Sequence, residues 1–442
     1  MTDQFGLPRN LGDGLVLRWA TPEDADEIAE FNIAIHSDNP EEPEVFLGHW
    51  TRDLMNGRHP TTHADDFTVV VDENNGRKIV STLNLISQRW AYEGIEFGVG
   101  RPELVGTLPE YRQRGLIRAQ MEAVHAKSAV RGEMVQAITG IPWYYRMFGY
   151  EMALNLGGGR AFFWNRSGND KKVDEEVYRL RKATTADIPH LAKLYAITGQ
   201  HSLVQRVRDE ALWTYELTER HPDSPYALNM YLIETAVGEA AAYANFHQWG
   251  EAFTVGEFAA MPGHSWRATA LFLTRALKKQ ADELNKEREK PINVISFSLN
   301  AEHPVYQALG RQLERQRPPY AWYMRVPDLP AFLQHITPVL EKRLAQSILS
   351  GHSGTLRLNF YRQHMALVWE NGRLQQITPY EPKSVEDGDA RFPNLTFLQL
   401  LFGYRSMAEL DHAFADCYAA EEACILLDIL FPKRPSFVVG LG

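Results

Sequence analysis

The stretch from Val105 to Arg118, VGTLPEYRQRGLIR, joins an apolar strand pattern to a helical pattern through a proline, several arginines and one glycine. The first turn of a helix leaves its N–H groups unpaired and carries a partial positive charge, so a strand-to-helix junction is a natural anion site. Gly115 lets the backbone approach a ligand closely, and Arg112 and Arg114 can neutralise phosphate charge. The stretch predicts a pyrophosphate cradle made by the amides of Arg114, Gly115, Leu116 and Ile117.

A simpler interpretation of this stretch stays open. An isolated Arg-x-x-Gly is more often a loop that needs one glycine and some solvated arginines. Pro109 stops strand pairing, which would leave the end of the strand before it free to bond an extended ligand.

A second candidate for chemistry is Tyr145, in the aromatic run PWYYRMFGY. A phenol stays protonated at neutral pH, with a pKa of ~10, and can donate a proton to a developing negative charge. The neighbours Trp143, Tyr144 and Phe148 equally indicate a run of core aromatics. The residues alone leave both interpretations open.

Composition limits the classes of protein to consider. The chain has 442 residues, 44% of them apolar, and a net charge of -10. It is too long for one core, so we expect two to four domains. The negative charge argues against nucleic acid as the main partner and mildly favours a cationic ligand. The acidic stretches Asp38–Glu44 and Asp65-Asp66 could attract cations, but solvated loops are the favoured interpretation.

Targeting and metal signals are weak. No apolar run approaches the ~20 residues of a membrane span, and MTDQFGLPRN lacks the layout of a signal peptide, so we expect a cytoplasmic protein without a membrane partner. Cys417 and Cys424 predict neither a disulfide framework nor a metal site, and buried apolar cysteines are expected. His352 and His364 are isolated, so no metal is expected.

The sequence repeats itself. LRWATPEDADEI from Leu17 matches LRKATTADIPHL from Leu180, which makes Arg18 and Arg181 equivalent. PWYYRMFG matches PVYQALG, which makes Tyr145 and Tyr306 equivalent at nearly the same offset. Two independent matches at one offset predict a duplicated unit of roughly 150 residues, a common domain size.

The expected elements of each repeat alternate between strand and helix. Each repeat begins with a strand and a Thr-x-x-Asp cap before a helix, at Asp24–Ile35 and Asp187–Ile197. In the first repeat, β-rich segments with turn signals at Asn74-Asn75-Gly76 and Gly100-Arg101-Pro102 precede a helix from Leu116 to about Val130. This order predicts a mixed α/β fold, and the polar stretch RSGNDKKVD is a good boundary.

The last hundred or so residues form a third region. A helical pattern starts near Pro330 and is broken by Pro338. A hairpin signal stands at Asn371-Gly372, and two helical segments follow at Leu395–Leu401 and Ala413–Leu430. The predicted domains are therefore 1–168, 169–329 and 330–442.

The arginine-glycine loop resembles motif A of the GNAT superfamily of N-acetyltransferases, with Ile117 where a small residue is usual. One branch, the enhanced intracellular survival proteins, shares this departure. That branch has two tandem acetyltransferase folds with mixed sheets, α/β (α+β), and a C-terminal domain resembling sterol carrier protein. The resemblance covers essentially the whole chain, and it also rests on the Tyr-x-x-Phe-Gly-Tyr run at Tyr145–Tyr150.

The resemblance implies acetyl-CoA as cosubstrate, no metal, and a set of site residues. Tyr145 matches the general acid that protonates the coenzyme A thiolate, and the terminal carboxylate of Gly442 matches the base, although Leu441 stands where the family has other residues. The implied cofactor contacts are Val105, Gly106, Thr107, Gln113, Arg114, Gly115, Leu116, Ile117, Arg118, Gly140 and Ile141.

The second repeat lacks the cradle. MPGHSWRATALFLTRAL has no Arg-x-x-Gly and places Trp266 near the expected site, so we expect it to bind no coenzyme A and to support the first site. The main hypothesis is direct acetyl transfer to an amine, which needs no nucleophilic cysteine. Two rivals are a carrier of lipid or acyl ligands and a regulatory protein that senses acetyl-CoA without turnover.

No residue of the sequence identifies the acceptor amine. The resemblance implies an aminoglycoside, polyamine or lysine-like amine, as a small molecule or peptide. It also implies a homo-oligomer, since this branch tends to form hexamers.

Overall fold

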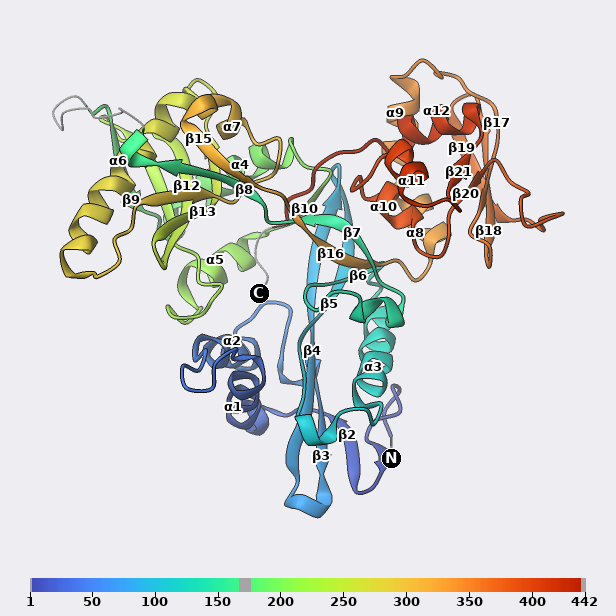
Figure 1. Ribbon diagram of the computed structural model, residues 1–442, viewed down its shortest axis with the longest axis horizontal. Coiled ribbons are helices and arrows are strands. Elements are labelled where there is room, and N and C mark those ends of the chain that lie inside the picture. The colour runs from blue at the N-terminus through green and yellow to red at the C-terminus, as the bar shows by residue number, and fades with distance from the viewer. Residues whose placement is uncertain (1, 167–175, 439–442) are drawn as a thin grey trace.

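The computed structural model describes residues 2–166 and 176–438. Its strands form three sheets of nine, seven and five strands. Figure 1 shows the first sheet as the central column, the second at the upper left and the third at the upper right. Mixed sheets combined with helices confirm the predicted α/β class.

The first sheet has the order β1-β2-β3-β4-β5-β6-β16-β7, and β10 pairs with β4. Its strands are β1 (Arg9–Gly12), β2 (Leu15–Trp19), β3 (Phe67–Asp72), β4 (Lys78–Tyr92), β5 (Ile95–Thr107), β6 (Val135–Ile138), β7 (Glu151–Leu156), β10 (Val204–Arg206) and β16 (Tyr320–Arg325).

Helices cover both faces of this sheet. On β4 the Ser81 hydroxyl donates to Gln120 of α3 (Leu116–Val130), whereas Thr82 donates to Asn32 of α1 (Ala25–His36). Successive side chains of a strand point to opposite faces, so α3 lies on one face, and α1 with α2 (Phe46–Met55) lies on the other. The middle of β4 is therefore buried on both sides, including its polar residues Ser81, Thr82 and Asn84.

The second sheet has the order β15-β8-β14-β13-β12-β11-β9. Its strands are β8 (Gly159–Phe163), β9 (Tyr178–Lys182), β11 (Met230–Thr235), β12 (Ala240–Trp249), β13 (Ala252–Ala260), β14 (Val294–Phe297) and β15 (Leu313–Arg317). The accompanying helices are α4 (Ile188–Gly199), α5 (Glu210–Thr218), α6 (Trp266–Leu284) and α7 (Pro304–Leu309).

The two sheets exchange strands. β16, the last strand of the predicted unit 169–329, inserts between β6 and β7 of the first sheet. β8, the last strand of the predicted unit 1–168, inserts between β14 and β15 of the second sheet. Each sheet is thus completed by the last strand of the other predicted unit, and part of the segment predicted as a linker lies outside the described residues.

The third region forms the sheet β19-β18-β17-β20-β21. Its strands are β17 (Gly354–Asn359), β18 (His364–Glu370), β19 (Arg373–Pro379), β20 (Ala390–Arg391) and β21 (Tyr418–Ala419), and its helices are α8 (Leu329–His335), α9 (Thr337–Ala345), α10 (Phe397–Leu401), α11 (Met407–Ala413) and α12 (Glu421–Leu430). The tip of the β4–β5 hairpin contacts it, because Tyr92 donates to the carbonyl of Leu401 and Glu93 pairs with Arg343.

Several local predictions can be compared with these elements. The equivalent arginines make equivalent contacts: Arg18 binds Asp24 through two hydrogen bonds of 2.7 Å, and Arg181 binds Asp187 at 2.9 and 2.8 Å. The break of the helical pattern at Pro338 and the Asn371-Gly372 hairpin are confirmed.

Two local predictions are wrong. Gly100-Arg101-Pro102 is not a turn, because β5 continues through it. The predicted helix Ala413–Leu430 is interrupted, since α12 begins only at Glu421 and the strand β21 precedes it. Cys417 is buried before that helix, and Cys424 is half-buried within it; neither forms a disulfide.

Candidate acyl-transfer site

A cavity of about 590 Å³ opens at the end of β5, against the loop before α3 and the 3-10 helix Tyr144–Phe148. Most of the predicted site residues line it together: Val105, Gly106, Thr107, Gln113, Gly115, Leu116, Ile117, Arg118, Ile141 and Tyr145. The cavity is open because β5 and β6 pair only at Val99–Val135 and Gly100–Gln136 and then separate.

The N-terminus of α3 is shaped for an anion. Gly115 is the N-cap residue at φ 76°, and no side chain caps the helix. An added Cβ at Gly115 would meet no atom within 4 Å, so the glycine borders open space. The amides of the first turn, which usually find a capping oxygen, therefore face a site where a ligand oxygen can serve.

Tyr145 forms the inner wall of the cavity and is only 5% exposed. A residue of β16 fixes the segment before Tyr145: the backbone N–H of Trp143 donates to the Tyr323 hydroxyl, with 2.5 Å between nitrogen and oxygen. Burial, and then the neighbouring Glu103 carboxylate, raises the pKa of Tyr145 well above its ordinary value. The phenol therefore stays protonated throughout the neutral range, as a proton donor must.

Two predicted residues are not part of the cavity wall, and a third lies outside the described residues. Gly140 lies behind Tyr145: its added Cβ would lie 3.5 Å from Tyr145 Cε2. Arg114 stacks its guanidinium on the Tyr111 ring, 5.3 Å from the centroid. Gly442, the predicted base, lies outside the described residues.

The cavity also has walls that sequence reasoning missed. Ile35 and His36 at the end of α1 line it, as do Met147 and Phe148. Nε2 of His36 is buried without a hydrogen-bond partner in the described chain, and burial lowers the pKa of this imidazole. No local pattern marks these α1 residues, because only the sheet brings them to β5.

Glu103 is the other residue that was missed. Its carboxylate pairs with Arg101, and both side chains are buried on β5. Burial raises the pKa of Glu103 to about 6, although Arg101 and a hydrogen bond from the Thr139 side chain oppose the shift. The sequence analysis missed this pair because it predicted a turn at Gly100-Arg101-Pro102. A charged residue in an exposed turn needs no buried partner.

The equivalent place in the second sheet is filled by its own side chains. The first turn of α6 is capped, because Ser265 accepts a hydrogen bond from the amide of Ala268. Trp266 packs against Phe258 and His303, with ring centroids 5.7 and 5.4 Å apart. The Tyr306 hydroxyl binds the backbone of Leu299 and Phe297. The start of α6 is thus capped, and aromatic side chains occupy the place beside it.

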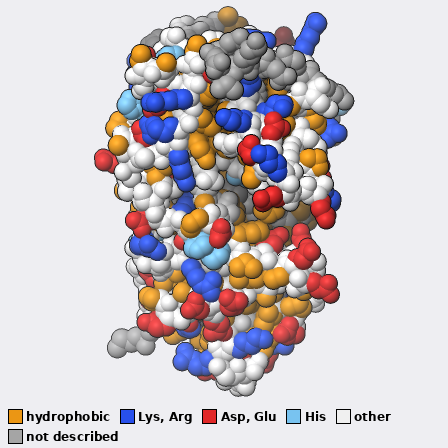
Figure 2. Space-filling view, turned by 90° about the vertical axis from the view of Figure 1, so that its left-hand side faces the viewer, with side chains coloured by type: hydrophobic (Ala, Val, Ile, Leu, Met, Phe, Trp, Pro, Cys, Tyr) orange, Lys and Arg blue, Asp and Glu red, His pale blue; other side chains and the backbone are white. Residues whose placement is uncertain are grey.

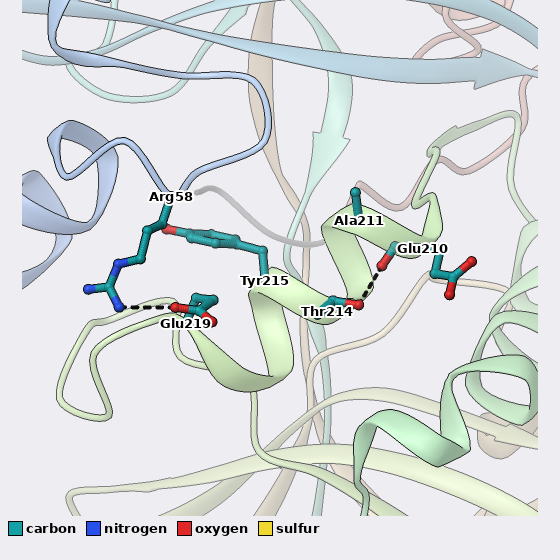
Figure 3. A pocket seen from close by; sticks show the side chains of 6 residues that line it. All are labelled: Arg58, Glu210, Ala211, Thr214, Tyr215 and Glu219. Carbon is teal, nitrogen blue, oxygen red and sulfur yellow. Dashed lines mark hydrogen bonds and ion pairs between the residues drawn. The ribbon is translucent and has the colours of Figure 1, made fainter.

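A further cavity of about 680 Å³ lies between the loop after α2 and the helix α5. Figure 3 shows its six lining side chains, with Arg58 paired to Glu219 at 3.0 Å and the Thr214 hydroxyl bound to the carbonyl of Glu210. None of the predicted site residues that the structure describes lines it.

One group of side chains has the composition of a metal site but does not fit an ion. Ligand atoms of His49, His221 and Asp223 lie within 4.8 Å of one another. The two imidazole rings are stacked, with their centroids 3.8 Å apart and an angle of 3° between their planes. A ring nitrogen binds a metal in the plane of its ring, and two parallel planes at this separation cannot meet at one ion.

The acidic stretches of the sequence differ in their surroundings. Asp66 is buried and pairs with Lys127 and Arg131, so it is structural rather than a solvated loop residue. In contrast, Asp38, Glu41 and Glu42 are exposed in the loop between α1 and α2. Figure 2 shows the side of the molecule that lies at the left of Figure 1, and acidic side chains are frequent over its lower half.

Comparison with known proteins places these features in a family context. Residues 17–153 match the family described as an acetyltransferase (GNAT) domain. No curated protein sequence matches the chain. Among the described residues, no helix is long and apolar enough to cross a membrane.

Solved structures share the fold over nearly the whole chain. A conserved protein of Enterococcus faecalis V583, described as a probable N-acyltransferase, has a TM-score of 0.69 at 14% identity and covers 96% of this chain and 98% of its own. A GCN5-related N-acetyltransferase from Kribbella flavida has a TM-score of 0.65 at 19% identity and covers 96% and 97%. Eis1 from Mycobacterium abscessus has a TM-score of 0.59 at 13% identity and covers 95% and 98%.

The comparisons support one class of enzyme. Residues 17–153 are similar to a GNAT acetyltransferase domain, and the solved structures share the fold of the chain. An N-acetyltransferase is the enzyme class that these findings support.

Proposed function

We propose that the protein transfers an acetyl group from acetyl-CoA directly to a primary amine of an aminoglycoside, polyamine or lysine-like acceptor. The observation that carries this proposal is the cavity of about 590 Å³, whose wall joins a free strand end, an uncapped helix and Tyr145.

Each residue of the cavity has a role that follows from its position. The strand end Val105–Thr107 binds the extended arm of the cosubstrate, and the amides at Gly115–Ile117 bind its pyrophosphate, with Arg112 and Arg118 at the rim. Gly140 and Ile141 border the reacting end. Tyr145 donates its proton to the departing sulfur, because it is buried there and stays protonated.

The base needs separate consideration. The terminal carboxylate of Gly442 is the base that the family resemblance implies, and a water molecule is the alternative. The described part of the tail approaches the duplicated region: the N–H of Leu203 donates to the carbonyl of Pro435, and the N–H of Phe437 donates to that of Val204.

The division of the chain follows the same proposal. Residues 1–168 form the catalytic unit, 169–329 a second acetyltransferase unit without cofactor, and 330–442 a unit similar to sterol carrier protein. A cytoplasmic homo-oligomer, with a hexamer as the favoured form, completes the proposal, and light scattering on the full chain tests it.

The decisive experiment is release of the coenzyme A thiol from acetyl-CoA across a panel of aminoglycosides, polyamines, basic peptides and arylalkylamines. Turnover with one class names the acceptor. If acetyl-CoA binds but no amine is acetylated, the acetyl-CoA sensor becomes the better account. A lipid that co-purifies with the chain, without acetyl-CoA binding, favours the carrier.

A further inference from the structure

Two isoleucines from separate elements lie near the reacting end of the cavity. Ile35, near the end of α1, packs against the end of β5, because a Cβ added at Gly106 would lie 2.8 Å from Ile35 Cγ2. Ile141 follows Gly140, whose added Cβ would lie 3.5 Å from Tyr145 Cε2. Both isoleucines line the cavity. An amine that approaches Tyr145 therefore meets aliphatic side chains from two directions of the chain.

The apolar wall continues into exposed surface. Ile141 is 64% exposed, and Met147, on the 3-10 helix Tyr144–Phe148, is 54% exposed. Both line the cavity. Large apolar side chains that stay exposed beside a cavity are typical of ligand sites, because a ligand covers them when it binds. Ile141 and Met147 thus offer apolar surface that the described chain leaves uncovered.

The charged groups of the cavity wall have one sign. Arg112 and Arg118 line it, and the proposed function places both at the pyrophosphate of the cosubstrate. Among the described residues, no aspartate or glutamate lines the cavity. His36 also belongs to the wall, but burial lowers the pKa of its imidazole, so the ring carries no charge at neutral pH. A cation other than the reacting ammonium group would therefore find no counter-charge in this wall.

The carboxylates closest in sequence to the wall lie in other surroundings. Glu103 on β5 is buried and pairs with Arg101. Glu110, on the 3-10 helix Pro109–Tyr111, and Asp38, in the loop after α1, are exposed, and neither lines the cavity. Because an unpaired charge is costly to remove from water, a second ammonium group inside the cavity would weaken binding.

We propose that the acceptor is a primary amine whose single ammonium group ends an apolar alkyl or aryl body. This inference rests on the proposed function and concerns the same site. The nitrogen reaches the thioester beside Tyr145, and the body packs on Ile35, Ile141 and Met147. A lysine-like chain and an arylalkylamine have this form. A polyamine or an aminoglycoside brings further ammonium groups that the wall leaves unpaired.

A matched pair of acceptors tests the charge of the body. Pentylamine and cadaverine have the same carbon chain, and only the second amino group of cadaverine distinguishes them. With saturating acetyl-CoA at neutral pH, we expect kcat/KM for thiol release to be about tenfold higher or more with pentylamine, after correction for the two equivalent amino groups of cadaverine. Equal values, or a preference for cadaverine, would overturn the proposal.

The length of the apolar body is tested separately. In the series from propylamine to hexylamine, each CH2 group that packs on the wall should raise kcat/KM by about fourfold. Met147→Ser removes part of the wall and should lower the gain for each CH2 group. A flat series in wild type contradicts the proposal. A gain that follows the acyl chain of the donor, from acetyl-CoA to butyryl-CoA, and not the amine contradicts it as well.

One substitution should shift the preference toward the diamine. His36→Glu places a carboxylate in the cavity wall, so the second ammonium group of cadaverine gains a partner. We expect kcat/KM for cadaverine relative to pentylamine to rise about tenfold. His190→Glu is the matched control, because it makes the same change at an exposed position of α4 that does not line the cavity; its ratio should equal that of wild type. An unchanged ratio in folded His36→Glu would count against the wall. If His36→Glu does not fold, the matched pair in wild type decides.

Binding without turnover separates this inference from the proposed function. Calorimetric titration of the complex of protein and coenzyme A should show tighter binding of pentylamine than of cadaverine. If both amines are acetylated equally well, the proposed function stands and this inference fails. If pentylamine binds but no amine of the panel is acetylated, the proposed function fails, and the claim that this wall holds an acceptor fails with it.

Discussion

The Tyr306 hydroxyl accepts a hydrogen bond from the backbone N–H of Leu299 at 3.1 Å and lies 3.0 Å from the carbonyl of Phe297, to which it donates. It therefore ties α7 to the backbone around the end of β14, where a pantetheine arm would need free backbone groups. In the described part of the chain, the equivalent Tyr145 hydroxyl makes no such bond to the backbone, and Tyr145 lines a cavity instead.

This difference predicts one acetyl-CoA per chain. Calorimetric titration should give a stoichiometry near one, because Ser265 caps the start of α6 and Trp266 packs where a second molecule would bind. Tyr306→Phe should lower the free energy of unfolding by about 1–3 kcal/mol, since it leaves the Leu299 N–H without its partner, while thiol release stays unchanged. A stoichiometry of two would contradict the assignment of the second unit.

Gly115→Ala should abolish acetyl-CoA binding. Its φ of 76° strains any other residue by about 1 kcal/mol, and the new methyl would project into the open space that the ligand needs. Gly132→Ala is the matched control, because Gly132 at φ 71° follows the other end of α3 and also has no atom near an added Cβ. Both variants should lose similar stability by denaturant unfolding. Stoichiometric binding of acetyl-CoA to Gly115→Ala would refute the cradle.

Tyr145→Phe should lower kcat by about 100-fold or more, because the sulfur would lose its proton donor, and should leave the affinity for acetyl-CoA within about threefold. Tyr150→Phe is the control from the same aromatic run: Tyr150 is buried and its hydroxyl bonds to His125 at 2.7 Å, away from the cavity wall. Single-turnover thiol release measures both. An unchanged kcat in Tyr145→Phe would remove the residue from the mechanism.

Glu103 should also make stability depend on pH. Its pKa is raised from 4.5 to about 6 in the folded chain, so between these values the folded state binds more protons than the unfolded state. The free energy of unfolding must then fall as pH rises through this window, by about 2 kcal/mol in total. Urea unfolding from pH 4 to pH 7 should show this term in wild type and a smaller slope in the double variant Arg101→Met, Glu103→Gln. Equal slopes would show that the Glu103 pKa is not raised.

Local chemistry made much of the first unit predictable. The strand Leu15–Trp19, the helix Leu116–Val130 and the paired arginines at Arg18 and Arg181 follow from periodicity and capping residues, which act over a few positions. The start of α3 at Gly115 was predictable for the same reason, because a helix N-terminus and its glycine are neighbours in the chain.

The remainder depended on contacts between distant residues. The turn expected at Gly100-Arg101-Pro102 fails because Arg101 finds Glu103 and the Trp322 ring, 4.6 Å from its guanidinium, in the interior. His36 reaches the cavity only through the packing of α1 on the sheet. The exchange of β8 and β16 could not be predicted from the hydrophobic pattern, because the pattern of a strand does not show which of two sheets it joins.

That exchange constrains how the protein is made. On a ribosome, residues 1–166 emerge long before β16, so the first sheet waits with β6 and β7 unpaired on facing edges until about residue 325 has left the exit tunnel. Exposed edges of this kind are where nascent chains associate wrongly. A gene truncated after the first repeat would encode the loop at Gly115 but not β16, whose Tyr323 holds Trp143, so the first sheet would remain incomplete.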